Sequence, residues 1–214
     1  MTVDNAGPEG DLSLMNQASL ELDRSEIRRQ QILDAAKECF RRQGFHGASM
    51  ATISKTARMS VGHIYHYYEN KEAIIAAIVQ QDVQELLKLF QDLEESADIL
   101  EAMTAKADHG FEYHTDPDLA TLGLEIVAEA ARNPKMGSIV QSADQITRGA
   151  VIAALRKGYA SRGRQLSEAE LAARFEVIAA LFEGLSVRAI RNPQLDRAAT
   201  LAGLKQAMQA ILNA

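Results

Sequence analysis

The sequence predicts an all-α fold of about nine helices. Apolar residues make up 47% of the 214 residues, and the helix formers alanine and leucine are prominent among them. Only four prolines occur, and no segment shows the apolar–polar alternation of a half-buried strand. Apolar residues instead recur every three or four positions, as on the buried face of a helix.

Residues 1–24 are predicted to form a disordered or partly helical arm. They show no sustained period and contain a Gly-Pro-Glu-Gly breaker at 7–10, with one helical turn expected over 12–20. The first strong helix is expected over 25–43, and Gly44 ends it. Its apolar face carries Ile32, Leu33, Ala36, Cys39 and Phe40.

Two very short helices are expected next, over 50–57 and 61–67. Ser49 and Ser60 stand directly before them and suit N-caps, because a serine hydroxyl accepts a bond from a free N–H of the first turn. Asn70 caps a longer helix over 71–93 in the same way.

The remaining chain is expected to form a larger helical body. Pro117 and Pro134 suit first-turn positions, where the missing N–H costs nothing. Ser167 and Glu170 predict a capping box, and an Asn-Pro pair at 192–193 separates the last two helices. The expected helices cover 97–115, 117–132, 134–161, 167–191 and a last segment ending near 212.

The charge is unevenly distributed along the chain. The net charge is −6, yet residues 25–75 carry +3, between an N-terminal segment of −4 and a C-terminal segment of −5. A basic segment on an acidic body suits a DNA-binding head whose body must not adhere to DNA. The sequence thus divides into an arm (1–24), a DNA-binding head (25–74) and a body (75–214).

Composition also argues against several classes of protein. No apolar stretch approaches the roughly 18 residues of a membrane span, and acids occupy the N-terminus where a signal peptide needs a positive flank. We therefore expect a cytoplasmic protein. A single cysteine, Cys39, excludes an intrachain disulfide and a cysteine-based zinc site. No metal and no cofactor are expected.

Segment 49–74 has the pattern of a helix-turn-helix. Two short helices are joined by a tight turn, and a serine opens the second one. The second helix needs apolar residues beneath it and a polar outer face. The expected anchors are Ile53, Ala57, Met59, Ile64 and Tyr68. The residues left for the major groove are Val61, Gly62, His63, Tyr65 and His66.

With the preceding helix and the Phe-His-Gly at 45–47, this segment resembles the TetR/AcrR family of transcriptional regulators. Arg58 departs from the family, which often has glycine in the turn. Because the left-handed region costs arginine about 1 kcal/mol, we expect a less demanding turn. The matching residues are Gly47, Ser49, Thr52, Ile53, Ala57, Ser60, Gly62, Ile64, Tyr65, Tyr68, Lys71 and Glu72.

The resemblance implies particular DNA contacts. Hydroxyls, an imidazole and an ammonium near helix N-termini suit phosphates, which position a protein without reading sequence. The expected phosphate contacts are Ser49, Thr52, Tyr65, His66 and Lys71. Val61, Gly62 and His63 are expected at the base edges, on a helix capped by Ser60.

The family's helical body binds a small molecule and dimerises. The apolar character of the candidate pocket predicts a hydrophobic effector. Its expected residues are Leu86, Phe90, Met103, Phe111, Leu122, Ile126, Tyr159, Phe175 and Phe182. The last two helices suit a four-helix dimer interface, although an intrachain core would show the same stripe. The expected interface residues are Leu171, Ile178, Leu185, Leu201, Leu204 and Met208.

Two polar clusters have alternative readings. The first contains Asp108, His109, Glu112 and His114, but histidines five apart point in different directions on a helix, which favours a solvated face over a metal site. In the second, Glu125 and Glu129 share a helical face, and the neighbouring Arg132 favours a surface ion network over acid–base chemistry.

We therefore expect a dimeric, non-enzymatic regulator. It would act as a repressor that a small hydrophobic effector releases from a palindromic DNA operator, with half-sites about 34–36 Å apart. The alternatives are a helical dimer acting through a protein partner and an enzyme using the C-terminal pocket. Specific operator binding separates these readings.

Overall fold

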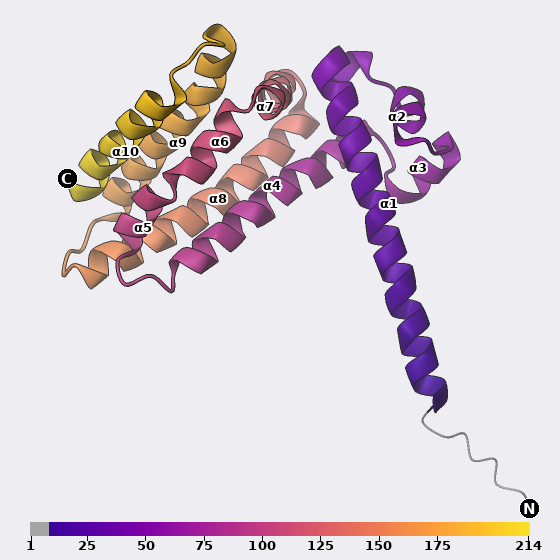
Figure 1. Ribbon diagram of the computed structural model, residues 1–214, viewed down its shortest axis with the longest axis horizontal. Coiled ribbons are helices and arrows are strands. Elements are labelled where there is room, and N and C mark those ends of the chain that lie inside the picture. The colour runs from indigo at the N-terminus through magenta and orange to yellow at the C-terminus, as the bar shows by residue number, and fades with distance from the viewer. Residues whose placement is uncertain (1–8) are drawn as a thin grey trace, which may run out of the picture.

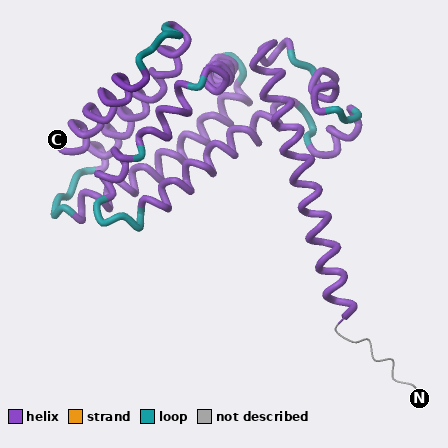
Figure 2. The backbone as a smooth tube through the Cα atoms, viewed as in Figure 1, coloured by secondary structure: helices purple, strands orange, loops and turns teal. Residues whose placement is uncertain are grey.

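The computed structural model describes residues 9–214, with side chains from Arg24 onward. All regular elements in this part of the chain are α-helices (Figure 2), as predicted. They are α1 (Glu9–Gly47), α2 (Met50–Ala57), α3 (Val61–Tyr67), α4 (Lys71–Leu93), α5 (Ile99–Ala105), α6 (Ala107–Thr115), α7 (Pro117–Ala130), α8 (Pro134–Ser161), α9 (Glu168–Arg191) and α10 (Arg197–Asn213).

The helices form a small head and a larger body (Figure 1). In the head, α2 and α3 lie on one side of α1, whose N-terminal half extends well beyond them. Helix α4 leads from the head into the body, where it runs beside α8. The predicted caps Ser49, Ser60 and Asn70 are confirmed, and so is the capping box of Ser167 and Glu170.

Helix α1 is longer than expected. Residues 1–8 of the predicted arm lie outside the described residues, but the chain is helical from Glu9 onward. No glycine or proline falls between Asp11 and Gln43, so nothing stops the helix over that stretch. Gly44 breaks the helical geometry with φ 67° and ψ 172°, the positive φ that glycine adopts without steric cost.

The helix expected over 97–115 is two helices. Lys106 separates them, and its N–H bonds back to the carbonyls of Ala102 and Thr104 at the end of α5. The segment contains neither proline nor glycine at the break. Apolar spacing therefore gave no sign of it, and the prediction of one continuous helix was wrong.

Three apolar clusters hold the protein together. The first joins α1–α4 to Leu122 and Ile126 of α7 and to Met136 of α8. The second lies between α4, α5, α8, α9 and the end of α10, and the third lies between α6, α9 and α10. Because α7 supplies side chains to the first cluster, the head shares its core with the body.

Candidate nucleic-acid interface and effector cavity

The N-terminus of α2 presents two exposed or half-exposed hydroxyls. The Ser49 Oγ accepts a hydrogen bond from the backbone N–H of Thr52 at 3.0 Å and lies 2.9 Å from the Thr52 Oγ1. This capping bond fixes the entry of the helix. Both hydroxyls lie where the positive end of the helix dipole favours an anion.

The turn between α2 and α3 corrects an expectation. Arg58 does adopt the left-handed conformation, with φ 54° and ψ 42°. The surrounding hydrogen bonds explain why this strain persists: the Arg58 N–H bonds to the Lys55 carbonyl, and Ser54 donates from its hydroxyl to the Met59 carbonyl at 2.7 Å. Gln31 of α1 also donates to the Ala57 carbonyl at 2.7 Å. The turn therefore does require the left-handed conformation, and hydrogen bonds from neighbouring residues stabilise it.

Helix α3 is polar outside and apolar beneath, as predicted. Ile64 is fully buried and Tyr68 is 6% exposed, so both anchor the helix. The Ser60 Oγ accepts from the His63 N–H at 3.1 Å. We call the exposed residues the recognition face: Val61, Gly62, His63, Tyr65 and His66.

Tyr67 and Tyr68 belong to the head rather than to its outer face. The Arg29 guanidinium lies 5.6 Å from the Tyr67 ring centre and 5.9 Å from that of Tyr68. Burial raises the pKa of the Tyr68 hydroxyl, partly offset by the Arg29 charge. The rings of His63 and His66 pack edge-on against Tyr67 at 5.3 and 5.2 Å. Tyr67 thus orients two imidazoles of the recognition face.

Lys71 has a structural role that the sequence did not reveal. Its Nζ donates to the carbonyls of Phe45 and Ala48, at 2.7 and 2.8 Å, and lies 4.4 Å from the Phe45 ring centre. Two of its three N–H groups therefore tie the start of α4 to the end of α1. Only the third remains for the phosphate contact that we expected of this residue.

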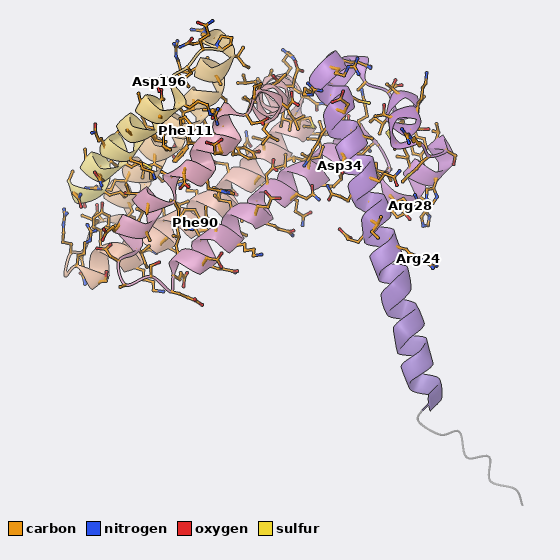
Figure 3. All side chains as sticks on the ribbon, in the orientation of Figure 1. Arg24, Arg28, Asp34, Phe90, Phe111 and Asp196 are labelled. Carbon is orange, nitrogen blue, oxygen red and sulfur yellow. The ribbon has the colours of Figure 1, made fainter. Side chains whose placement is uncertain are left out.

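A basic groove beside α3 was missed by the sequence argument. It lies between the recognition helix and α1, with a volume of about 360 Å³. Arg28 lies on α1 at the level of α3, and Arg24 lies about one turn closer to the N-terminus (Figure 3). Their spacing of four along one helix was the available signal, since it places both on one face. The groove is lined by Arg24, Ser25, Arg28, His63, His66 and Tyr67.

The body contains an apolar cavity of about 230 Å³. It lies between α4, α5, α6, α8, α9 and α10. Five of the predicted pocket residues line it: Leu86, Phe90, Met103, Phe175 and Phe182. Gly110 makes room for one of them, since a Cβ at that position would lie 2.6 Å from the Phe182 ring.

Four predicted pocket residues do not line this cavity. Phe111 is 1% exposed and packs in the cluster between α6, α9 and α10. Leu122 and Ile126 are buried in the head's core. Tyr159 packs between α5, α8 and α9, and its hydroxyl donates to the Leu212 carbonyl at 2.9 Å. All four lie at the spacing of a buried helical face, as predicted, but they pack against helices outside the cavity.

His114 lies at the polar side of the cavity, contrary to the expected solvated face. It is half-buried, and its Nδ1 lies 3.0 Å from the Ser186 Oγ. Desolvation lowers the pKa of His114 to about 4, so the imidazole is neutral at pH 7. Neighbouring His109 is exposed. No cluster able to hold a metal ion occurs among the described residues.

A smaller hollow of about 220 Å³ adjoins the cavity, and both are lined by Leu86, His109, Gly110, His114 and Thr147. Within it, the Tyr113 hydroxyl donates to the Asp82 Oδ2 at 2.9 Å. Burial raises the pKa of the Asp82 carboxyl, and burial, aided by the neighbouring Asp82 carboxylate, raises the pKa of the Tyr113 hydroxyl.

The predicted dimer residues face inward in the single chain. Leu171 and Ile178 belong to the second apolar cluster. Leu185, Leu204 and Met208 belong to the third, with Leu201 packed against it. The apolar stripe therefore forms an intrachain core, which the sequence had left as the alternative to a dimer interface. The opposite faces of α9 and α10 are exposed. They carry Glu176, Glu183, Gln206 and Gln209 among many small or short side chains: Ala173, Val177, Ala180 and Gly184 on α9, with Ala199, Ala202, Gly203 and Ala210 on α10.

Polar contacts also join the body to the head. Arg41 of α1 pairs with Asp118 of α7 at 2.7 Å, and the His46 Nε2 lies 2.9 Å from the Glu129 Oε2. Glu129 is 2% exposed, so its carboxylate is buried and not on the surface as expected, although the expected partner Arg132 lies 3.8 Å from it. Its other oxygen accepts from Asn133 at 3.0 Å, while Oε2 has no well-oriented hydrogen bond.

Two family models match the chain. One describes bacterial regulatory proteins of the tetR family and matches residues 32–78. This range covers the C-terminal part of α1, all of α2 and α3, and the start of α4. The other describes the C-terminal domain of BetI-type transcriptional repressors and matches residues 111–213. The chain belongs to the TetR family.

Relatives of this TetR-family chain are named as regulators. The HTH-type transcriptional regulator UidR of Escherichia coli K12 is 35% identical over 114 residues, covering 53% of this chain and 57% of UidR. The repressor Rv1474c of Mycobacterium tuberculosis is 26% identical over 118 residues, covering 51% of this chain and 63% of its own length. The matches therefore span about half to two thirds of these relatives.

Solved structures of the family share the whole architecture. GusR of Salmonella enterica superposes with a TM-score of 0.71 at 26% identity, covering 87% of this chain and 96% of GusR. FadR of Bacillus subtilis superposes with a TM-score of 0.72 at 21% identity, covering 84% of this chain and 96% of FadR.

Within the described part of this TetR-family chain, no helix is long and apolar enough to span a membrane.

Proposed function

We propose that this chain is a dimeric, DNA-binding transcriptional regulator of the TetR type. The observation that carries the proposal is the construction of α3, whose Ile64 is fully buried while Val61 and Tyr65 are 37% and 52% exposed. A short helix held from beneath in this way can enter the major groove. Val61, Gly62 and His63 then approach base edges, with phosphates bound by Ser49, Thr52, Tyr65 and His66.

The basic groove extends this interface. Arg24 and Arg28 are exposed beside the recognition face, and arginine binds phosphate through parallel N–H groups. Replacing both with glutamine lowers affinity about equally for all DNA sequences and reduces the salt dependence of binding. The matched pair Arg156→Gln and Arg191→Gln, in the body, leaves both quantities unchanged.

The dimer forms through the exposed faces of α9 and α10, with two helices from each copy. Gly203 has open space within 4 Å of a Cβ position, so a large side chain there fits the isolated chain. Gly203→Arg gives a folded monomer by light scattering, because the side chain projects into the interface. A variant that stays dimeric assigns the interface to another face. Gly149→Arg on α8, where a Cβ also meets nothing, serves as the control.

The cavity takes a small effector that releases the protein from DNA. FadR, whose likeness to this chain bears on the fold alone, was solved with stearoyl-CoA. A ligand between α6 and α9 would shift α7, which follows α6 and packs into the head's core. A coupling of about 1–3 kcal/mol between the two sites suffices for a switch.

The deciding experiment is selection of bound fragments from the source genome, titrated at two salt concentrations. Recovery of one short palindrome bound by two copies supports the proposal. Recovery of no sequence above background contradicts it and favours the alternative of a helical dimer acting through a protein partner.

A further inference from the structure

Glu129 is the one charged residue in the described part of the chain that is fully buried, with 2% of its surface exposed. Every ion pair between described residues that does not include it joins two side chains that are each at least 31% exposed. A carboxylate taken out of water is unfavourable unless charges or hydrogen-bond donors face both of its oxygens. The groups around these oxygens therefore decide whether the burial is tolerated.

The groups that face the Glu129 carboxylate come from two parts of the molecule. Asn133 donates to Oε1 at 3.0 Å and the Arg132 guanidinium lies 3.8 Å from Oε2, and both residues lie within four positions of Glu129 in the chain. The His46 Nε2 is closer to Oε2, at 2.9 Å, and it comes from the head. Because Oε2 has no well-oriented hydrogen bond, its compensation depends on these two facing groups.

His46 lies in the segment that leads from α1 into α2, residues 44–49, which we call the corner. The positive φ of Gly44 turns the chain there. Lys71 of α4 binds the corner through two backbone carbonyls, one of them that of Ala48. The corner is therefore fastened to α4 through its backbone and to α7 through the side chain of His46.

The corner ends at the hydroxyls that are proposed to bind DNA. Ser49 caps α2, and its Oγ lies 2.9 Å from the Thr52 Oγ1. A hydrogen bond from a hydroxyl to a phosphate oxygen spans only about 2.5–3.0 Å, so a displacement of about 1 Å removes it. The contacts that fix the corner relative to the body therefore also fix these DNA contacts.

We propose that Glu129 is a positioning residue for DNA binding. Through His46, its carboxylate holds the corner against α7 and so keeps Ser49 and Thr52 where phosphates can reach them. A carboxylate suits this task because both of its oxygens accept hydrogen bonds. An amide accepts through one oxygen alone and would lose either Asn133 or His46.

The pair also gives the effector cavity a polar connection to the DNA-binding helices. Helix α6 lines the cavity, and α7 begins directly after it at Pro117. A movement of α7 that separates Glu129 from His46 would leave Oε2 buried and facing Arg132 alone, which favours the joined placement of head and body. This part of the inference rests on the proposed function, because it names the contact through which ligand binding would reach the corner.

The first test is hydrogen exchange on the full chain without DNA. The amides of Ala48, Thr52 and Ile53 report on the corner, because they bond to its residues. Glu129→Gln and His46→Ala are each expected to speed their exchange about fivefold, and the double variant no further, since both remove one contact. His46→Arg keeps a cation for the carboxylate and should restore slow exchange. Effects that multiply in the double variant overturn the proposal.

Asp118→Asn is the matched control. It removes the other ion pair between α7 and α1, in which Asp118 meets Arg41 at 2.7 Å. Both side chains of that pair reach solvent, and Arg41 precedes Gly44, so the pair does not hold the corner. Exchange at the three amides should stay as in the wild-type protein. An effect equal to that of Glu129→Gln overturns the proposal, because it assigns the change to head–body packing in general.

The second test is titration of the palindrome recovered by genomic selection at several salt concentrations. Glu129→Gln and His46→Ala should each weaken binding about fivefold without changing its salt dependence, because neither removes a phosphate contact. If His46 bound a phosphate itself, His46→Ala would reduce the salt dependence, and Glu129→Gln would strengthen binding by removing a repelling charge. That result overturns the proposal.

Failure of this inference is distinguishable from failure of the proposed function. If no palindrome is recovered, the proposed function fails, and a random-sequence duplex replaces it in the titration, because Ser49 and Thr52 would meet phosphates in any sequence. Faster exchange at the corner with unchanged affinity for DNA contradicts the positioning role alone. Faster exchange together with weaker binding of DNA supports it.

Discussion

Arg58 is the one described residue other than glycine with a positive φ, and it holds the turn of the helix-turn-helix. The left-handed region costs a side chain about 1–2 kcal/mol, whereas glycine loses about 0.5–1 kcal/mol of chain entropy on folding. Arg58→Gly is therefore expected to raise the free energy of unfolding by about 0.5–1 kcal/mol, measured by urea denaturation. Arg58→Ala keeps the strain and should leave stability nearly unchanged. Equal stabilisation by both variants would mean that the arginine side chain, not its backbone, is unfavourable.

His114 gives the protein a pH-dependent stability. Burial lowers its pKa to about 4 in the folded protein, against an ordinary value of 6.5, so the unfolded chain takes up the proton first as pH falls. The stabilisation is complete above pH 6.5 and is lost as pH falls toward 4. His114→Asn retains an amide for the bond to Ser186 but does not titrate.

The measurement is urea denaturation of both proteins at several pH values. Between pH 7 and pH 4 the wild-type protein should lose roughly 2 kcal/mol more than the variant, since the half-buried imidazole realises only part of the full linkage. Asp82 and Glu183, whose pKa values are raised, titrate in both proteins and cancel in the difference. If the unfolding free energies of the two proteins changed in parallel with pH, the imidazole would be solvated in the folded state.

At the scale of elements, a substitution at Gly62 tests whether helix α3 approaches DNA closely. A Cβ at Gly62 meets nothing within 4 Å, so Gly62→Ala fits the fold and gains up to about 0.5 kcal/mol of helix propensity. On the recognition face the same methyl stands between the helix and the base edges. Operator affinity should fall while stability rises. Gly149→Ala on α8, also in open space, should gain stability without losing affinity. If affinity survives in Gly62→Ala, this edge of α3 does not approach DNA closely.

Elements were predictable wherever a few neighbouring residues decide them. Serine and asparagine caps, the prolines at 117 and 134 and the capping box each act within one helical turn, and the structure has them all. The break at Lys106 carries no glycine or proline and was missed. Periodicity also identified the apolar face of α9, but it does not say whether that face meets its own chain or a second copy. Leu171 and Leu204 were assigned to a dimer for that reason, and they lie in the chain's own core.

At the scale of the whole molecule, too, apolar spacing shows which side chains are buried but not which distant helix they contact. Five of the residues predicted for the effector pocket line the cavity, because they lie on helices that converge in the body. Leu122 and Ile126 were placed there too, yet α7 turns them into the head. Contacts between segments far apart in sequence depend on how helices cross, and spacing along one helix does not contain that information. The basic groove between α1 and α3 was missed for the same reason.

The shared core has a consequence for how the whole molecule unfolds. Since Ile126 of α7 packs among the residues of α1–α4, the head should not be stable without α7. Ile126→Ala is expected to cost about 2–5 kcal/mol, as for other large-to-small changes in a core. Hydrogen exchange should become faster in α1 and α2 as well as in α7, because all three rely on one cluster.

Leu100→Ala removes a similar side chain from the second cluster, which holds the body alone. It should accelerate exchange in α5 and α8 more than in α1 and α2. If Ile126→Ala leaves exchange in α1 and α2 unchanged, the head is independent of α7 and a ligand in the body has no packed route to the DNA-binding helices. If exchange rises there, α7 is the element through which a shift beside the cavity reaches the head, since α7 follows α6 directly and lies in both parts of the molecule.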